Sequence, residues 1–289
     1  MQTLFDIIRI AKVGYDCYNR PEGGDGMRLL TLIENTACRE DLHAEHGLSL
    51  YIEACGRRIL FDMGQSGGFA GNAAVLGVDL GQVDLAVVSH GHYDHGGGML
   101  RFAQLNPNAP IYLHEDALQP HYNALGKSIG LDPGLAELSS VVFTQGTTEL
   151  SQGLTLVTGS WSIEDAPGAH GMWVQRDGER VRDDFSHEQY LLIREGGKTV
   201  CVSGCSHRGV EKILDAFRPD VFIGGFHFMK LDPVGGGREI LTRAARKLLA
   251  SDTEFYTCHC TGREQFAFLK NILGDRLHAL SGGIEIQIL

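Results

Sequence analysis

Residues 89–98 of the chain read SHGHYDHGGG, with His90, His92, Asp94 and His95 inside six positions and three glycines directly behind them. Imidazole and carboxylate are the side chains that bind zinc, iron or manganese at neutral pH. A polar loop with incidental histidines is the alternative interpretation, but histidine is too uncommon for such a cluster to be expected by chance. The stretch therefore predicts a metal-binding turn.

The sequence before this turn indicates how the side chains converge. DLAVVSH (84–90) is an apolar run typical of a buried strand, so the turn begins where a strand ends. On such a turn alternate residues can address one point while the next pair addresses a second point about 3.5–4 Å away, the spacing of two-metal sites. Gly91 and Gly96–98 leave room for the tight backbone path. We expect one or two divalent metal ions.

The composition is that of a globular protein with an acidic balance. Of 289 residues, 43% are hydrophobic and 21% charged, and the formal net charge is -11. Nucleic acids and anionic membranes are bound through basic surfaces, so we expect neither as a partner. No apolar run approaches the roughly 20 residues that span a bilayer. Asp6 and Arg9 interrupt the apolar N-terminal patch, which argues against a secretory signal. We expect a cytoplasmic protein, monomeric or homo-oligomeric, that acts on a small molecule.

The seven cysteines have an odd count and no compact disulfide spacing, so free thiols in a reducing compartment are expected. A structural zinc site of four cysteines is an alternative, and its ligands would be Cys201, Cys205, Cys258 and Cys260. Their C-x₃-C and C-x-C spacings differ from the usual pairs of zinc knuckles, which disfavours this alternative.

Apolar runs predict strands and amphipathic stretches predict helices, in two similar halves. Strands are expected at 28–33, 48–54, 57–64, 84–90, 110–117, 154–158, 189–194, 198–204, 220–227, 253–262 and 283–289. Helices are expected to begin near Gly97 and to cover 116–126, 209–217, 238–250 and 262–273. The segment 162–186 is expected to be a long loop or hairpin at the rim of the active site. This order predicts two mixed sheets covered by outer helices, in a single domain spanning 1–289.

The motif His90-x-His92-x-Asp94-His95 resembles the signature of the metallo-β-lactamase superfamily. Further stretches resemble a subgroup around the archaeal 7,8-dihydropterin-6-methyl-4-(β-D-ribofuranosyl)aminobenzene 5′-phosphate synthases. These stretches are EHGLSLYIE (45–53), ILFDMG (59–64), SGCSHRG (203–209), IGGFH (223–227) and CHCTG (258–262). The resemblance implies an α/β fold, the αββα sandwich of two mixed β-sheets flanked by helices, with one or two metals at the edge of the sheets.

The resemblance also implies roles for individual residues. The first metal would be bound by His90 and His92, and the second by Asp94, His95 and His259. Asp62, in a Phe-Asp-x-Gly turn, would bind metal or, more in keeping with the superfamily, brace a ligand histidine through its second nitrogen.

The chain departs from the superfamily pattern at the bridging aspartate and at the third histidine of the first metal. Gly204-Cys205-Ser206-His207 stands where a Gly-Asp turn is expected. His207 is the best substitute ligand, because this turn should face the same pocket. Cys205 has three interpretations: a thiolate ligand, which would favour zinc over magnesium or manganese, a small packing residue, or a nearby nucleophile.

About twenty residues before Cys205, Ser186-His187-Glu188-Gln189 offers no clear third histidine in register. Glu188 could bind metal or orient His207, whereas His187 is expected at the surface. His227, at a strand end after two glycines, is either a substrate contact and general acid or a core histidine satisfied by backbone groups. The remaining histidines are expected to be structural or exposed, with His46 a candidate to brace a ligand; they are His43, His46, His114, His121, His170 and His278.

The predicted reaction is hydrolysis by a metal-activated hydroxide at a mono- or dinuclear site, since a bound divalent metal lowers the pKa of water to about 7. Asp94 and His227 are the predicted catalytic residues. No Walker A loop is present. We therefore expect a metal-dependent hydrolase of a small, phosphate-containing or ester substrate, with Zn²⁺ as the first choice of metal and Mn²⁺ or Fe²⁺ as others.

Three residues follow ligand-bearing turns and are candidate contacts for a substrate phosphate, namely Arg208, Lys230 and Thr261. Two other functions stay open. The first is a transferase that performs a condensation, as the synthases named above do. The second is an iron-binding redox or sensor protein, which is disfavoured because such superfamily members usually keep the acidic bridge that this chain lacks.

Overall fold

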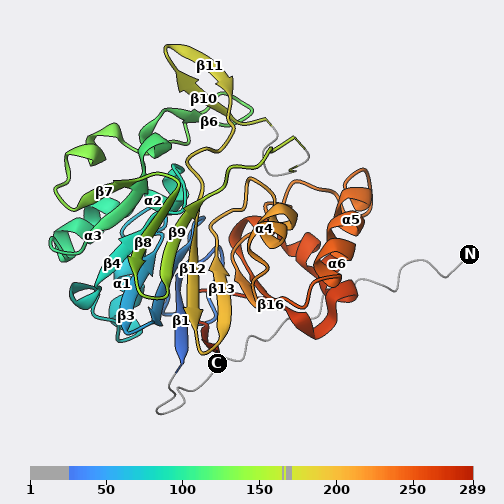
Figure 1. The fold of residues 1–289 in the computed structure, drawn as a ribbon, viewed down its shortest axis with the longest axis horizontal. Coiled ribbons are helices and arrows are strands. Elements are labelled where there is room, and N and C mark those ends of the chain that lie inside the picture. The colour runs from blue at the N-terminus through green and yellow to red at the C-terminus, as the bar shows by residue number, and fades with distance from the viewer. Residues whose placement is uncertain (1–25, 165, 167–170, 289) are drawn as a thin grey trace, which may run out of the picture.

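The strands build two large sheets at the centre of the molecule (Figure 1). The computed structural model describes residues 26–164, 166 and 171–288. The first sheet has the order β17 (Glu285–Ile288), β1 (Met27–Ile33), β2 (Ser49–Ala54), β3 (Arg57–Phe61), β4 (Leu85–Val87), β5 (Ile111–His114) and β7 (Val141–Thr144). The second has the order β16 (Leu277–Ala279), β15 (Glu254–Thr257), β14 (Val221–Ile223), β13 (Lys198–Val202), β12 (Gln189–Glu195), β9 (Leu154–Thr158) and β8 (Thr147–Ser151).

Each sheet is antiparallel in one part and parallel in the other. In the first sheet β17, β1, β2 and β3 pair antiparallel, and β3, β4, β5 and β7 pair parallel. In the second sheet β8, β9, β12 and β13 pair antiparallel, and β13, β14, β15 and β16 pair parallel. The predicted order of antiparallel strands followed by strand–helix alternation in each half is therefore confirmed.

Alternating side chains of the strands fill two different cores. Along β12, Leu191 and Ile193 belong to the core between the sheets, whereas Tyr190 and Leu192 belong to the core under the outer helices. Successive side chains of a strand point to opposite faces, and both faces of this sheet are covered, so both sets are apolar.

Helices cover the outer face of each sheet (Figure 1). On the first sheet lie α1 (Gly68–Val75) and α3 (Met99–Leu105), whose Phe69 and Phe102 pack with Leu60. On the second lie α4 (Val210–Phe217), α5 (Arg238–Leu249) and α6 (Arg263–Leu273), packed against residues such as Phe222 and Phe255. The predicted αββα sandwich is confirmed. Within the described residues, the helices are too short or too polar to cross a bilayer.

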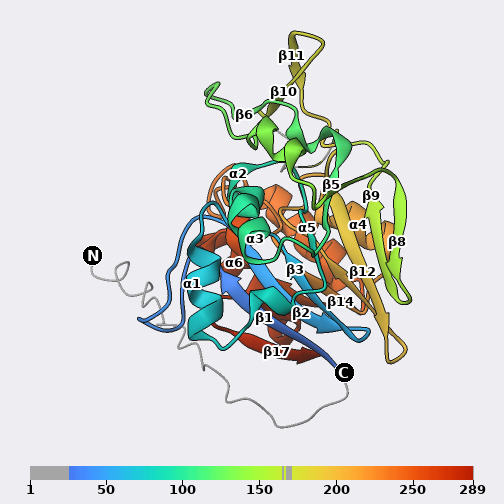
Figure 2. The ribbon, with the colours of Figure 1, turned by 90° about the vertical axis from the view of Figure 1, so that its left-hand side faces the viewer.

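A third, small sheet of β6 (His121–Tyr122), β10 (Trp173–Arg176) and β11 (Glu179–Arg182) projects from the body of the molecule (Figure 2). It confirms the hairpin predicted within 162–186, although residues 165 and 167–170 lie outside the described residues. The N-terminal stretch 1–25, with Asp6, Arg9 and Cys17, also lies outside them.

The helix predicted over 116–126 is wrong. The chain makes only a short 3₁₀ turn, η2 (Glu115–Leu118), and then enters β6. Pro120 has no N–H for a helix, and its ring disfavours helical backbone at Gln119, which is extended. The sequence analysis did not predict α1, β7, β8 and β16. The remaining short elements are η1 (Leu80–Gln82), η3 (Pro133–Glu137), η5 (His259–Thr261) and η6 (Gly274–Arg276).

Candidate metal centre

Three loops that follow parallel strands bring the predicted ligands together. The loop after β4 contains His90 and leads into the short helix α2 (Tyr93–Gly96), which carries Asp94 and His95. The loop after β13 carries His207, and His259 begins η5 after β15. All of these side chains are buried. Their convergence depends on the stacking of the two sheets, because β4 belongs to one sheet and β13 and β15 to the other.

Atoms able to bind a metal gather in overlapping groups around Cys205. The first group is His90, Cys205 and His207, and the second is His95, Cys205 and His259; within each, these atoms lie within 4.8 Å of one another. Asp94 forms a third such group with His259 and the exposed His46. We call the seven residues His90, His92, Asp94, His95, Cys205, His207 and His259 the metal centre. Its first half is the group of His90, Cys205 and His207, and its second half is the group of His95, Cys205 and His259. Cys205 belongs to both halves, at the position where the sequence has a cysteine instead of an aspartate.

Hydrogen bonds behind the histidines decide which ring nitrogen faces the centre. The Ser89 hydroxyl donates to Asp62 at 2.8 Å, so its oxygen accepts from Nδ1–H of His90, also at 2.8 Å. Oδ1 of Asn35 accepts from Nδ1–H of His259 at 2.8 Å, and the Asn35 amide is oriented by its second bond to the His259 carbonyl. In both rings Nε2 is left with a lone pair turned to the centre, the tautomer that binds metal.

Two hydrogen-bond acceptors, on His259 and Asp94, face each other in the centre. Burial lowers the pKa of His259 to about 4, so the ring is neutral at pH 7. Its bare Nε2 lies 3.3 Å from Oδ2 of Asp94. Burial opposes ionisation of Asp94, but the charge of the neighbouring His95 holds its pKa well below the usual range. A lone pair and a carboxylate at this distance repel each other unless a cation lies between them, so the residues fit a divalent metal.

His95 is held by the same carboxylate that orients His90. Its Nδ1 lies 2.6 Å from Oδ2 of Asp62. Burial lowers the pKa of His95, but Asp62 and Asp94 outweigh it and raise the value to about 9. Nε2 therefore carries a proton at the place where the ligand atoms converge, and a divalent metal would displace that proton on binding. Asp62 braces the centre without reaching into it.

Cys205 offers a thiol to both halves of the centre. Its Sγ lies 3.2 Å from Nε2 of His95. Burial, with the adjacent Cys260 thiol, raises the pKa of Cys205 well above its ordinary value, so the sulfur keeps its proton until a cation binds. A thiol that coordinates a metal loses its proton outright, and the centre then gains a negative charge at its middle.

Known proteins are similar to this chain in sequence and in fold. A family model described as the metallo-beta-lactamase superfamily matches residues 44–258. The chain belongs to the metallo-β-lactamase superfamily. The crystal structure of Tm1679, a metal-dependent hydrolase of the β-lactamase superfamily, matches it with a TM-score of 0.76 at 27% identity, over 91% of this chain and 99% of Tm1679.

Two proteins of Methanocaldococcus jannaschii are also similar to this superfamily member. An uncharacterized protein is 28% identical over 241 residues, which cover 80% of this chain and 89% of the relative. The 7,8-dihydropterin-6-methyl-4-(β-D-ribofuranosyl)-aminobenzene-5′-phosphate synthase is 27% identical, over 88% of this chain and 95% of the synthase. This similarity extends beyond the motif to most of both chains.

The glycines of the superfamily motif lie where backbone approaches backbone. A Cβ added at Gly91 would stand 2.1 Å from the carbonyl oxygen of Ala117, and one at Gly98 would stand 2.3 Å from that of Met63. Neither carbonyl can move as a side chain can, so no larger residue fits without a shift of the chain. The expectation that these glycines make room for a tight path is confirmed.

Four residues in or beside the metal centre hold a left-handed backbone although they are not glycines. The φ angles are 58° at Asp62, 57° at Ser206, 53° at His227 and 50° at His259. Each such residue costs about 1–3 kcal/mol and persists only where the surrounding structure over-determines it. These are four of the eight such residues in the described part of the chain, and strained backbone of this kind clusters at functional sites.

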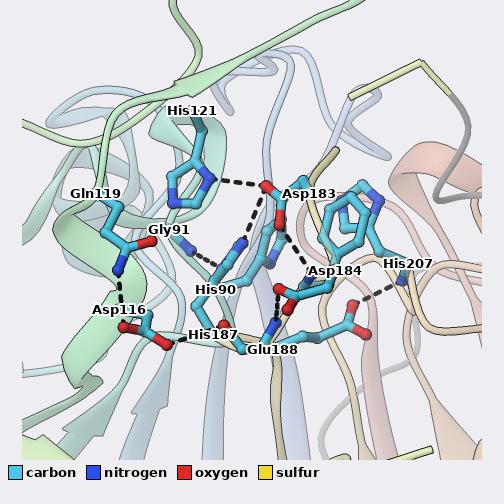
Figure 3. A network of polar contacts seen from close by, with 12 residues as sticks. His90, Gly91, Asp116, Gln119, His121, Asp183, Asp184, His187, Glu188 and His207 are labelled. Atoms are coloured by element: carbon cyan, nitrogen blue, oxygen red, sulfur yellow. Dashed lines mark hydrogen bonds and ion pairs between the residues drawn. The ribbon is translucent and has the colours of Figure 1, made fainter. Parts of the chain in front are cut away.

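His187 was expected at the surface, and this expectation is wrong. The ring is fully buried, its Nδ1 accepts from the Gly91 N–H at 2.9 Å, and its Nε2 lies 3.4 Å from Asp183 (Figure 3). Because Nδ1 accepts, Nε2 carries the proton and is no lone-pair ligand. His187 therefore fixes the backbone of the motif from 96 positions away, a contact that no local pattern could reveal.

Glu188 orients the turn of His207 from behind. Its carboxylate accepts from the backbone N–H of His207 at 2.7 Å and of Arg208 at 3.0 Å, and from the hydroxyl of Tyr190 at 2.6 Å. Figure 3 shows it beside the chain at His207. Both carboxylate oxygens are occupied by these donors, so of the two roles considered for Glu188 the contacts favour orientation over metal binding.

His227 lies beside the centre and is partly exposed. Its ring centroid is 4.2 Å from that of His207. Burial, with His207 and Lys230 nearby, lowers the pKa of His227 well below its ordinary value. A neutral imidazole with access to solvent is available as a hydrogen-bond donor to a substrate, in keeping with the role expected for it. Lys230, three residues after His227, is exposed.

The contacts of Arg208 and Thr261 do not support a role in binding phosphate. Arg208 donates through its guanidinium to the carbonyl oxygens of Asp184 and Trp161. The hydroxyl of Thr261 accepts from the N–H of Phe226 at 2.9 Å. Both side chains are buried and engaged by the protein itself, so they shape the loops around the centre instead of facing a substrate.

The four-cysteine alternative is wrong, because its members lie in different cores. Cys201 packs under the outer helices, whereas Cys258 packs between the sheets. Five cysteines of the described residues form no disulfide, as expected, namely Cys55, Cys201, Cys205, Cys258 and Cys260. Sequence reasoning missed Asn35 and Ser89, which set the tautomers, and also His121 and Asp183. Only Ser89 had a signal, because it precedes the motif directly.

Proposed function

We propose that this chain is a metal-dependent hydrolase that acts on a small, phosphate-containing or ester substrate at a dinuclear zinc centre. The observation that carries the proposal is the bare Nε2 of His259 facing the Asp94 carboxylate at 3.3 Å, since that contact calls for a cation. Cys205 is shared by both groups of ligand-capable atoms and favours zinc, because thiolate is a soft ligand. The similarity to Tm1679, itself described as a metal-dependent hydrolase, supports the reaction class.

The residues divide the work between holding the metal and contacting the substrate. A divalent metal bound here supplies a Lewis acid and water with a pKa of about 7. The neutral rings of His90 and His92 offer lone pairs, because burial lowers the pKa of both. Asp94 adds the fixed negative charge that retains a cation. His227, at the partly exposed side of the centre, donates a hydrogen bond to the departing oxygen of the substrate, which takes its proton from solvent water.

Metal analysis and hydrolysis of model substrates test the proposal. We expect about two zinc ions per chain and hydrolysis of bis(p-nitrophenyl) phosphate or p-nitrophenyl acetate, both abolished by chelation. His92→Ala should lower the rate by at least about 100-fold, since it removes a ligand. His278→Ala is the matched control, because this histidine pairs with Glu254 far from the centre and should leave the rate unchanged. Full activity of His92→Ala would overturn the proposal.

A condensing synthase is the second candidate function. The 27% identity to the archaeal synthase over 88% of this chain and 95% of that enzyme favours it. The two candidates differ in whether a new bond joins two organic substrates. Mass spectrometry after incubation with a dihydropterin and a ribosylated aminobenzene phosphate distinguishes them, because a condensed product supports the synthase and its absence beside phosphodiester hydrolysis supports the hydrolase. For either function we propose a small-molecule substrate in the cytoplasm and no nucleic-acid partner, in line with the net charge of -11.

A further inference from the structure

The rings of His90, His95 and His259 each have a protein partner on the nitrogen that faces away from the centre. These partners are Ser89, Asp62 and Asn35. His92 differs from the other three. Its Nδ1 faces Nε2 of His90 at 3.1 Å, while its Nε2 is buried and has no hydrogen-bond partner among the described residues. A buried imidazole nitrogen without a hydrogen-bond partner lowers the stability of the fold, so we expect a hydrogen-bond partner for Nε2 of His92 nearby.

His121 is the side chain placed to supply this partner to Nε2 of His92. The two rings meet edge to face with centroids 5.7 Å apart. Ligand-capable atoms of His92, His121, Asp183 and His187 all lie within 4.8 Å of one another. Nε2 of His121 is also buried and without a hydrogen-bond partner among the described residues. The same small space therefore holds two unsatisfied imidazole nitrogens.

The hydrogen bonds of Asp183 fix where the protons lie. The carboxylate accepts from the N–H of Phe185 at 2.8 Å, from His187 at 3.4 Å and from Nδ1 of His121 at 2.8 Å (Figure 3). A carboxylate that only accepts requires a proton on Nδ1 of His121, which leaves Nε2 of that ring as a lone pair. A lone pair needs a donor, and Nε2–H of His92 is the donor at hand.

We propose that His121, held by Asp183, is the positioning residue of His92 in the metal centre. Nε2–H of His92 donates to one bridging water, which donates in turn to the lone pair on Nε2 of His121, and this commits Nδ1 of His92 to the metal. Two hydrogen bonds of about 2.8 Å that meet at a water span roughly 4–5 Å, and ligand-capable atoms of the two rings lie within 4.8 Å of each other. The inference rests on the metal centre of the proposed function. Asp183 and His121 thus do for His92 what Asp62 does for His95.

The alternative interpretation of this cluster is a separate metal site with His121 as a ligand. The proton positions disfavour it. Nε2 of His187 carries a proton because Nδ1 accepts from Gly91, and Asp183 is already taken by three N–H donors. Only His92 and His121 would remain as ligands, too few for a structural site, which normally has four. The two readings differ in the number of ions bound.

Zinc titration of the full chain against a chromophoric chelator tests the inference through stoichiometry and affinity. The variants are His121→Ala, Asp183→Asn and His121→Gln, with His114→Asn as a control at a buried histidine outside the cluster. We expect the same number of ions in all, and a 10–100-fold weaker Kd in His121→Ala, the usual effect of losing a ligand's outer partner. His121→Gln should recover most of the affinity, because an amide can donate to Asp183 and accept from the water.

Three results would overturn the inference. They are an unchanged Kd in His121→Ala, the loss of one whole ion in that variant, and an affinity in His121→Gln as weak as in His121→Ala. Nitrogen-15 spectra of the wild type keep the test independent of variant folding, since a proton on Nδ1 of His92 in place of Nε2 also contradicts it. A wild type that binds zinc through His92 but hydrolyses nothing would refute the proposed function alone. Hydrolysis with a Kd indifferent to His121 would refute this inference alone.

Discussion

Sγ of Cys205 lies 3.2 Å from Nε2 of His95, and the same sulfur belongs to the group formed with His90 and His207. One thiol therefore stands between the two halves of the centre. Its raised pKa means that the metal-free protein holds it as a neutral thiol. The charge at the middle of the centre is thus created by metal binding, whereas a carboxylate in the same place would carry it beforehand.

Replacing this thiol should change which metal the centre prefers. Cys205→Asp supplies a hard oxygen ligand, so we expect weaker zinc binding and a relative gain for Mn²⁺ of about tenfold or more. Cys205→Ser should remove the near-ultraviolet sulfur-to-metal charge-transfer band of the Co²⁺-loaded protein. Co²⁺ spectra and competitive titrations with both metals check this. A charge-transfer band that survives in Cys205→Ser would show that Cys205 is not a ligand.

Asp62 should be among the most costly carboxylates to remove. It is fully buried and accepts from the Ser89 N–H, the Ser89 hydroxyl and His95. We expect Asp62→Ala to lower the free energy of unfolding by about 3–5 kcal/mol, because buried donors lose their partner. Urea denaturation in the presence of EDTA measures the effect without metal.

The matched control for Asp62 is Asp41→Ala. Asp41 is exposed and pairs with Arg39 two residues away, so its loss should lower the free energy of unfolding far less than the loss of Asp62. Equal losses for the two variants would contradict the bracing role of Asp62.

Two glycines should respond in opposite directions to the same substitution. Gly91→Ala places a Cβ 2.1 Å from the Ala117 carbonyl oxygen, so we expect destabilisation by at least about 2 kcal/mol and weaker metal binding. Gly71→Ala lies within α1, with nothing within 4 Å of the added Cβ, and should stabilise the protein by about 0.5–1 kcal/mol. Thermal and urea unfolding compare the pair. A Gly91→Ala variant as stable as Gly71→Ala would refute the close approach at the motif.

His114 should make the protein sensitive to mild acid. Burial lowers its pKa below 6.5, against the opposing charges of Asp116 and Glu115. The unfolded chain then binds a proton that the folded chain does not, so stability is complete above pH 6.5 and is lost as pH falls below it. His114→Asn keeps an acceptor for the Asp116 N–H without titrating.

The difference in unfolding free energy between His114→Asn and the wild type tests this directly. It should be constant above pH 7 and shift towards the variant below pH 6.5, by at most about 1.4 kcal/mol per pH unit. A difference that stays flat down to pH 5 would show that His114 keeps its ordinary pKa when folded.

Long strands of this fold could be predicted from the sequence because their patterns are local. The runs at 28–33, 189–194 and 198–204 became β1, β12 and β13 with boundaries shifted by a residue or two at most. β6 could not be predicted in this way, since two residues carry no periodicity and are extended only because β10 pairs with them. The helix predicted over 116–126 does not form, because Pro120 prevents it although the composition of the segment favours a helix.

The sequence by itself determined the motif of His90, His92, Asp94 and His95, because residues this close on one turn are held together by covalent geometry. It also determined that a cysteine and not an aspartate follows β13. Only the tertiary structure decided that this cysteine stands between two groups of ligands, that His187 is buried, and that His121 and Asp183 lie behind His92. These contacts join residues from 29 to 110 positions apart, and such distances close only when strands pair within a sheet and the two sheets stack.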